Sequence, residues 1–119
     1  MNDPLTPLES AVLDKLLAHD GEPFDTLRQQ LSHSSVSRRE FSGAGFFTHF
    51  SVPPEAPVRR DLRDAELGDV EAEIAGLQHG AGFLLFVRGG VVSFLEGFSY
   101  DEPWPSVVND FRVFEDRAT

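Results

Sequence analysis

Four histidines and one glutamate are the residues of this chain whose types could support acid–base or metal chemistry: His19, His33, His49, His79 and Glu96. No two histidines have the spacing of metal ligands on adjacent helical turns, so we predict no metal site. His49 and His79 come together if their strands are neighbours, with Glu96 nearby. These three residues are the candidate pocket of a small enzyme or ligand-binding domain. A purely structural role, as polar residues with satisfied hydrogen bonds at strand ends, explains these positions equally well.

Glu96 is the most informative carboxylate, because it follows Phe94 and Leu95 and precedes Gly97. A carboxyl group in apolar surroundings has a raised pKa, and such groups occur in active sites. The alternative is a rim position, where Glu96 pairs with an arginine or accepts backbone N–H groups. We favour the rim, because no second catalytic group can be placed beside Glu96.

No motif in the chain specifies a reaction. The sequence has no serine-centred elbow, no glycine loop of the kind that cradles phosphate, and no pair of carboxylates at catalytic spacing. It also has no cysteine, which excludes disulfides and thiolate chemistry. We therefore expect a non-catalytic protein without a cofactor, and we keep an enzyme as the alternative.

Acidic and aromatic side chains provide the candidate binding residues. Strict alternation over residues 67–75 turns two glutamates outward as an acidic ridge. Residues 100–105, YDEPWP, combine aromatic, acidic and proline residues. Loops of this composition serve as interaction anchors or as lids on a core, and either role fits here. The predicted binding residues are Glu71, Glu73, Tyr100, Asp101, Glu102 and Trp104.

The stretch that must position these residues is a central hairpin. Only a Gly-Gly turn separates two apolar runs of strand length, residues 83–88 and 91–96. A two-residue turn of this type needs positive φ, which glycine adopts without steric cost. In the resulting register Leu85 pairs with Phe94, and Glu96 falls on the core face opposite Phe83.

The second face of this hairpin is too apolar to be exposed to water. It contains Leu84, Phe86, Val91 and Leu95, whereas a half-exposed antiparallel hairpin alternates apolar and polar residues. We therefore expect this face to be covered. The cover is formed by the chain's own helices, by a second copy of the chain in a homodimer, or by a partner protein.

The remaining elements are two helices and further strands. Thr6 caps a helix over residues 7–19, and Glu9 completes a capping box. A shorter helix starts at Pro23 and stops near residues 32–35. Strands over residues 36–41 (at an edge or in solvent), 46–52, 67–75 and 109–114 join the hairpin. The sequence thus predicts a single α+β domain, residues 1–119, with an N-terminal helical pair and a mostly antiparallel sheet of about five strands.

The composition limits the possible partners. The chain of 119 residues has a net charge of −10, which repels nucleic-acid backbones and attracts a basic partner. No apolar run is long enough to span a membrane. The N-terminal residues MNDPLTPLES lack a basic region followed by an apolar run, so we expect no signal peptide and a cytoplasmic location.

Three segments together resemble a family of small bacterial α+β proteins without an assigned function. They are GFFTHF at 45–50, LGDVEAEIAGLQHGAGFLLFVRGG at 67–90 and LEGFSYDEPWP at 95–105, which follow the pattern GFFTxF, GxGFxLF and LEGxxYxExWP. The three segments lie between residues 45 and 105, a span of about half of the chain. It implies one intact α+β domain and assigns no functional residue.

Two functional hypotheses follow from the sequence. The first is a non-catalytic protein-binding domain, in one version an immunity-protein-like or antitoxin-like inhibitor that masks a basic partner through its acidic surface. The second is a small enzyme or ligand-binding domain with a pocket near Glu96, His49 and His79. A homodimer formed through the second hairpin face is compatible with either.

Overall fold

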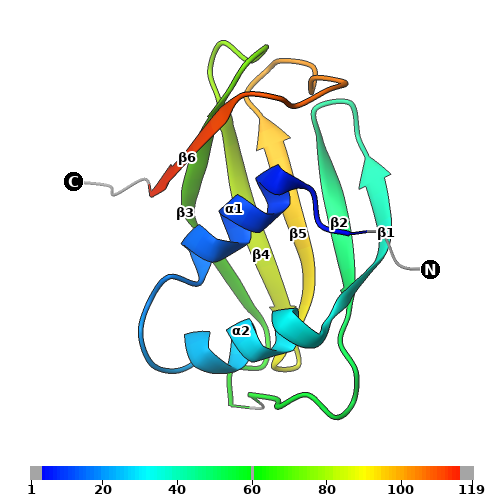
Figure 1. Cartoon of the computed structure of the whole chain (residues 1–119), viewed down its shortest axis with the longest axis vertical. Helices are drawn as coiled ribbons and strands as arrows, with labels where there is room; N and C mark the ends of the chain where they lie inside the picture. The colour runs from blue at the N-terminus through cyan, green and yellow to red at the C-terminus, as the bar shows by residue number, and fades with distance from the viewer. Residues whose placement is uncertain (1–3, 60, 116–119) are drawn as a thin grey trace.

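The computed structural model describes residues 4–59 and 61–115, and this part of the chain contains two helices and six strands (Figure 1). The elements are α1 (Pro7–Leu16), α2 (Phe24–His33), β1 (Ser35–Phe41), β2 (Gly45–Ser51), β3 (Ala65–Ile74), β4 (Ala81–Arg88), β5 (Val91–Ser99) and β6 (Phe111–Glu115). The predicted α+β class with the helices first is confirmed, with six strands in the described residues where about five were expected. The predicted single domain also includes residues 1–3, 60 and 116–119, which lie outside the described residues.

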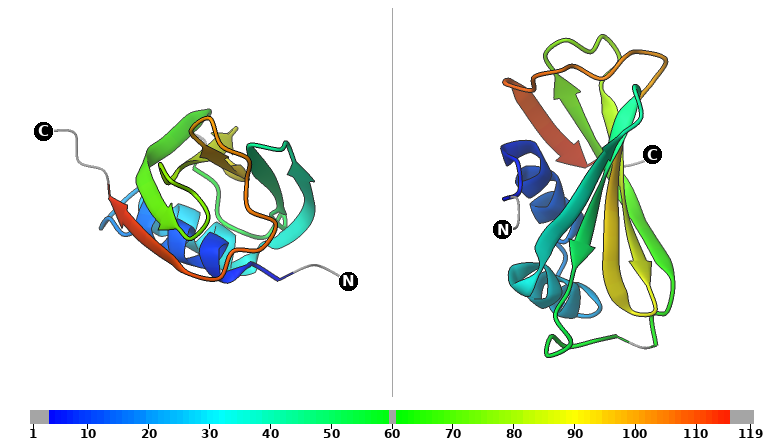
Figure 2. Two further views of the ribbon diagram at one scale, coloured as in Figure 1. Left: turned by 90° about the horizontal axis from the view of Figure 1, so that it is seen from above. Right: turned by 90° about the vertical axis from the view of Figure 1, so that its right-hand side faces the viewer.

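The sheet is antiparallel throughout and curls around the helices. Its strand order is β1-β2-β5-β4-β3-β6, so the strand predicted at an edge, residues 36–41, is indeed an edge strand. Both helices lie on the same side of the sheet (Figure 2). We call the side that the helices cover the inner face, and the opposite side the outer face.

The core lies between the inner face and α1. Leucine and valine side chains at helical spacing in α1 pack on the sheet, as expected for an amphipathic helix. Their partners include Phe83, Leu85 and Val87 of β4, each no more than 2% exposed. In β3, Val70, Ala72 and Ile74 are buried as predicted, so Glu71 and Glu73 between them face outward.

α1 begins with the predicted capping box. The Oγ1 atom of Thr6 accepts the backbone N–H of Glu9 at 3.1 Å, and the Glu9 carboxylate accepts the N–H of Thr6 at 2.8 Å. The helix ends at Leu16, short of the predicted end at residue 19. The guanidinium of Arg28 in α2 satisfies carbonyl groups just beyond this end, and these belong to Leu17 and His19.

A buried amide ties α2 to the sheet. The Gln30 side chain is 0% exposed. Its Nε2 donates to the carbonyl oxygens of Pro57 and Gly90, both at 2.9 Å, and its Oε1 accepts the N–H of Val92 at 2.8 Å. These bonds join α2 to the β4–β5 turn and to the connection between β2 and β3.

The β4–β5 hairpin contains an irregularity that sequence reasoning did not predict. Gly89 and Gly90 form its turn with φ angles of 61° and 79°. Beyond the Val87–Val92 pair the register shifts by one residue, because Ser93 is an extra residue in β5. Such a β-bulge exchanges the two faces of every residue that follows it.

Two predictions about the hairpin are therefore wrong. Leu85 pairs with Leu95, not with Phe94, and Leu95 is 0% exposed in the core. Glu96 pairs with Leu84 on the outer face and does not lie in the core opposite Phe83. The observed register buries a leucine in place of a carboxylate, which avoids the large cost of placing an unpaired charge in the core.

Candidate functional site

The outer face of the sheet has an aromatic centre. Four partly buried phenylalanines lie there on three adjacent strands: Phe47, Phe86, Phe94 and Phe98. The rings of Phe86 and Phe94 stack with centroids 4.4 Å apart, and Phe47 meets Phe94 edge-on at 6.0 Å. Within residues 4–59 and 61–115, both helices lie on the other side of the sheet (Figure 2). Of the three covers considered for the second hairpin face, the two described helices are therefore ruled out.

Glu96 lies in the middle of these aromatic residues. It is paired with Phe47 of β2 on one side and with Leu84 of β4 on the other. Phe94 and Phe98 are its neighbours on the same face of β5, two residues away in each direction. Burial raises the pKa of Glu96 above its usual value, and the negative charge of Glu66 raises it further.

The Glu96 carboxylate has no hydrogen-bond or ion-pair partner among the described residues, and the negative charge of Glu66 repels it. Pairing with an arginine, expected for a rim position, is therefore not observed. The site combines an unneutralised carboxylate with an apolar surround, and no second catalytic group lies next to it in the pairing register.

The predicted acidic ridge lies on β3, beside this aromatic centre. Glu73 accepts a hydrogen bond from Nε of Arg112 in β6 at 2.8 Å, and both side chains are exposed. The hydrogen bond from Arg112 and its positive charge lower the pKa of Glu73. Tyr100 Oη donates to Oε1 of Glu71 at 3.4 Å. The structure thus brings three of the predicted binding residues to one corner of the sheet.

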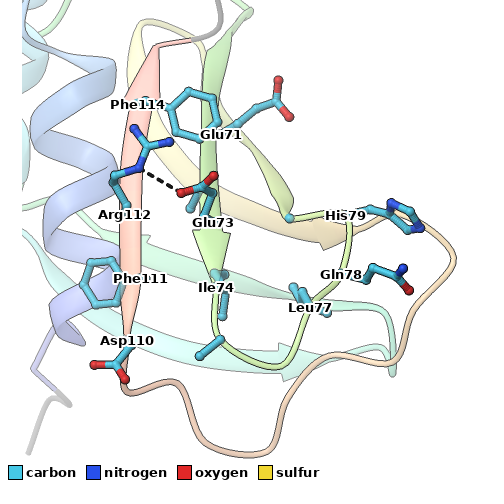
Figure 3. A pocket seen from close by; sticks show the side chains of 13 residues that line it. Glu71, Glu73, Ile74, Leu77, Gln78, His79, Asp110, Phe111, Arg112 and Phe114 are labelled. Atoms are coloured by element: carbon cyan, nitrogen blue, oxygen red, sulfur yellow. Dashed lines mark hydrogen bonds and ion pairs between the residues drawn. The ribbon is translucent and has the colours of Figure 1, made fainter.

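An open hollow of about 630 Å³ adjoins this corner, and its lining includes Glu71, Glu73 and His79. Figure 3 shows the Arg112–Glu73 pair bridging β6 and β3, while His79 lies on the turn after β3 and points away from that pair. The polar side chains of the hollow do not converge on a common point (Figure 3). Their arrangement suits contact with a surface better than it suits catalysis.

Glu102 has a structural role in the loop that follows β5. Its carboxylate accepts the backbone N–H groups of Gln78 and His79 at 2.7 and 2.8 Å. These two hydrogen bonds lower the pKa of Glu102. These bonds hold the loop against the turn between β3 and β4. They thereby help to position the corner of the sheet that carries Glu71, Glu73 and Tyr100.

The other two loop residues differ in their surroundings. Trp104 is partly buried and its ring meets Phe46 edge-on at 5.3 Å, and its backbone N–H donates to the Gly43 carbonyl at 2.7 Å. Of the two roles considered for this tryptophan, the lid on the core is the one that these contacts support. Asp101 is exposed and has a φ of 61°.

The histidines do not form a common pocket with Glu96. His49 is paired with Phe94, with ring centroids 5.4 Å apart, and its Nε2 lies 2.6 Å from Oε1 of Glu40. His79 precedes β4, beyond the far end of the β4–β5 pairing. β2 neighbours β5 and not β3 or β4, so the condition under which the two histidines would meet is not fulfilled.

The described residues contain no group of three or more histidines, aspartates or glutamates that could hold a metal ion. No helix in this part of the chain is long and apolar enough to cross a membrane.

Sequence reasoning missed one buried charged cluster. The carboxylate of Glu9 is 2% exposed and accepts hydrogen bonds from Nε and Nη2 of Arg39 at 2.9 and 2.7 Å and from Oγ1 of Thr48 at 2.5 Å. Burial alone would raise the pKa of Glu9, but the hydrogen bonds from Arg39, Thr48 and Thr6 outweigh it and leave the pKa lowered. This cluster joins α1 to β1 and β2 on the inner face and has a structural role.

No family model, curated protein or solved structure matches the chain. The resemblance to a bacterial family therefore stays a prediction from the sequence pattern.

Proposed function

We propose that this chain is a non-catalytic protein-binding domain that holds a basic partner protein against its outer sheet face. One observation carries the proposal: partly buried phenylalanines surround the Glu96 carboxylate, which has no partner among the described residues, on a face that neither described helix covers. An apolar centre with charged residues around it is typical of protein interfaces.

Charge supports a basic partner. The chain has 20 acidic and 10 basic residues other than histidine. Three glutamates on the outer face, Glu66, Glu71 and Glu96, lie within or beside the aromatic centre. Complementary charge speeds association and selects among partners more than it adds affinity.

A specific version of this function is an immunity-protein-like inhibitor that masks a basic toxin. The small acidic α+β fold is compatible with it, by analogy of general character. The second hypothesis, an enzyme or ligand-binding domain with His49, His79 and Glu96 in one pocket, has no geometric support because His79 lies apart from the other two.

The test has two steps. The tagged chain is first used to capture partners from its own cells, at low and at high salt. The captured protein is then purified and titrated by calorimetry against the wild type and the double variant Glu66→Lys/Glu71→Lys. The matched control is Asp14→Lys/Glu55→Lys, which changes the charge equally at exposed positions away from the outer face.

We expect the outer-face variant to bind at least about tenfold more weakly than the control, with a shallower salt dependence. Equal affinity of the two double variants would contradict the proposal. If only a second copy of the chain is recovered and analytical ultracentrifugation shows a dimer, the outer face forms a homodimer and does not bind a basic partner protein.

A further inference from the structure

Glu96 occupies an unusual position on the outer face. The cross-strand pairs Phe47–Glu96 and Glu96–Leu84 place apolar side chains on both sides of it. Along β5, Phe94 and Phe98 occupy the same face before and after it. One partly buried carboxylate is therefore flanked by four apolar residues on a face that no described helix covers.

This position is unfavourable for a carboxylate that has no partner. Apolar neighbours remove water from the charged group, and nothing among the described residues donates a hydrogen bond to it. Glu66, on the neighbouring side of the face, adds repulsion. A cation bound here would relieve both effects at once, since it would compensate the lost hydration and screen the two negative charges from each other.

Two arginines of the chain already form cation–π contacts with phenylalanine rings of the outer face. The Arg88 guanidinium carbon lies 5.2 Å from the centre of the Phe86 ring, and the corresponding distance between Arg112 and Phe114 is 4.8 Å. Both phenylalanines belong to the outer face. A guanidinium group also stacks on aromatic rings and binds carboxylates in a bidentate manner, which an ammonium group does less well.

We propose that Glu96 is the anchor of the binding face and receives one arginine side chain of the partner protein, with the rings of Phe94 and Phe98 beside the guanidinium. The inference rests on the proposed function and adds the chemistry of the contact. The carboxylate binds the guanidinium, and the apolar surround excludes water from the ion pair. Glu66 contributes a second negative charge near the same cation.

The first experiment needs no knowledge of the partner. The isotopically labelled full chain is titrated in NMR with the peptide acetyl-Gly-Arg-Gly-amide and with its citrulline counterpart, which has the same shape without the charge. We expect saturable shifts of the signals of Glu96, Leu84 and Phe94 with the arginine peptide, and at least about tenfold weaker binding of the citrulline peptide. A lysine peptide should bind with intermediate affinity.

The variant Glu96→Gln keeps the shape of the side chain and removes its charge. It should bind the arginine peptide about tenfold more weakly, whereas the control Glu55→Gln, an exposed acid outside the sheet, should bind like the wild type. Equal shifts with the arginine and citrulline peptides would overturn the inference. Shifts centred on Glu71 and Glu73 would do the same. The comparison of the arginine and citrulline peptides in the wild type tests the inference even if Glu96→Gln does not fold.

The captured partner separates this inference from the proposed function. Glu96→Gln should raise the dissociation rate about tenfold, because the guanidinium of the partner loses its charged acceptor. If Glu66→Lys/Glu71→Lys weakens the complex and Glu96→Gln does not, the binding face is correct and the anchor is wrong. If neither variant affects the complex, the proposed face itself is wrong.

Discussion

Phe94 of β5 stacks on Phe86 of β4, with ring centroids 4.4 Å apart and ring planes 17° from parallel. In an uninterrupted hairpin these two residues would point to opposite faces, since Phe86 would pair with Ser93. The extra residue in β5 therefore creates the aromatic centre of the outer face. The same shift moves Glu96 out of the core and into that centre.

Deletion of Ser93 tests this account of the bulge. A deletion within a central strand normally turns every following side chain to the wrong face. Here it removes the residue without a partner and leaves Leu95 in the core and Glu96 outside. We expect the deletion variant to fold, with the Phe86–Phe94 contact retained in NOE spectra. Deletion of Leu84, in the regular partner strand, should abolish the cooperative unfolding transition. Loss of folding in both variants would contradict this account.

Local signals in the sequence were sufficient for most of the elements. The capping box at Thr6 and Glu9 marks the start of α1, and strict alternation in β3 identifies Val70, Ala72 and Ile74 as inward. These features depend on neighbours in the chain, so periodicity and capping rules detect them.

Features that depend on distant residues were not predictable. The bulge at Ser93 has no glycine or proline to mark it, and it follows from the energetic preference for Leu95 over Glu96 in the core. The Glu9–Arg39 pair joins residues 30 positions apart, and nothing local distinguishes Arg39 from its neighbour Arg38. The position of Glu96 in the candidate site could not be predicted for the same reason, because it depends on the bulge.

Gln30 should contribute strongly to stability, because its amide makes three hydrogen bonds in a fully buried position. Gln30→Ala removes the partner of the Val92 N–H and of the Pro57 carbonyl and opens a cavity, whereas the Gly90 carbonyl still accepts the backbone N–H of Arg59. We expect a loss of about 2–4 kcal/mol in the free energy of unfolding, measured with urea. The adjacent Gln29 is exposed, and Gln29→Ala should change the free energy by less than about 0.5 kcal/mol. Similar losses in the two variants would show that the buried amide is not the cause.

The Glu9 cluster should make stability depend on pH. The pKa of Glu9 in the folded protein lies below the usual value of 4.5, because hydrogen bonds from Arg39 and Thr48 outweigh burial. Its contribution is therefore fully present above pH 4.5 and is lost as the pH falls through the lower folded-state pKa. Unfolding in urea at a series of pH values measures the loss of stability, and direct NMR titration of the Glu9 carboxyl measures its pKa in the folded protein.

Glu9→Gln should remove that part of the pH dependence and lower the free energy of unfolding at neutral pH by about 3 kcal/mol, because Arg39 loses its charged partner. Asp14→Asn, at an exposed position of the same helix, provides the control. A Glu9 carboxyl that titrates at its usual pKa would contradict the proposed role of the cluster.

Glu96 should show the opposite behaviour, because its pKa is raised by burial and by the charge of Glu66. An acid with a raised folded-state pKa binds its proton more readily in the folded chain, so the charged form destabilises the fold. This destabilisation is present above the folded-state pKa and disappears as the pH falls through it toward the unfolded value of 4.5.

We therefore expect Glu96→Gln to raise the melting temperature of the isolated chain at neutral pH, with the gain shrinking as the solution is acidified. Glu55→Gln, at an exposed position away from the sheet, should leave the melting temperature unchanged at every pH. Such a loss of stability in the free domain is common for residues that serve binding, because their surroundings are completed only in the complex. A lower melting temperature for Glu96→Gln at neutral pH would instead assign Glu96 a role in holding the sheet together.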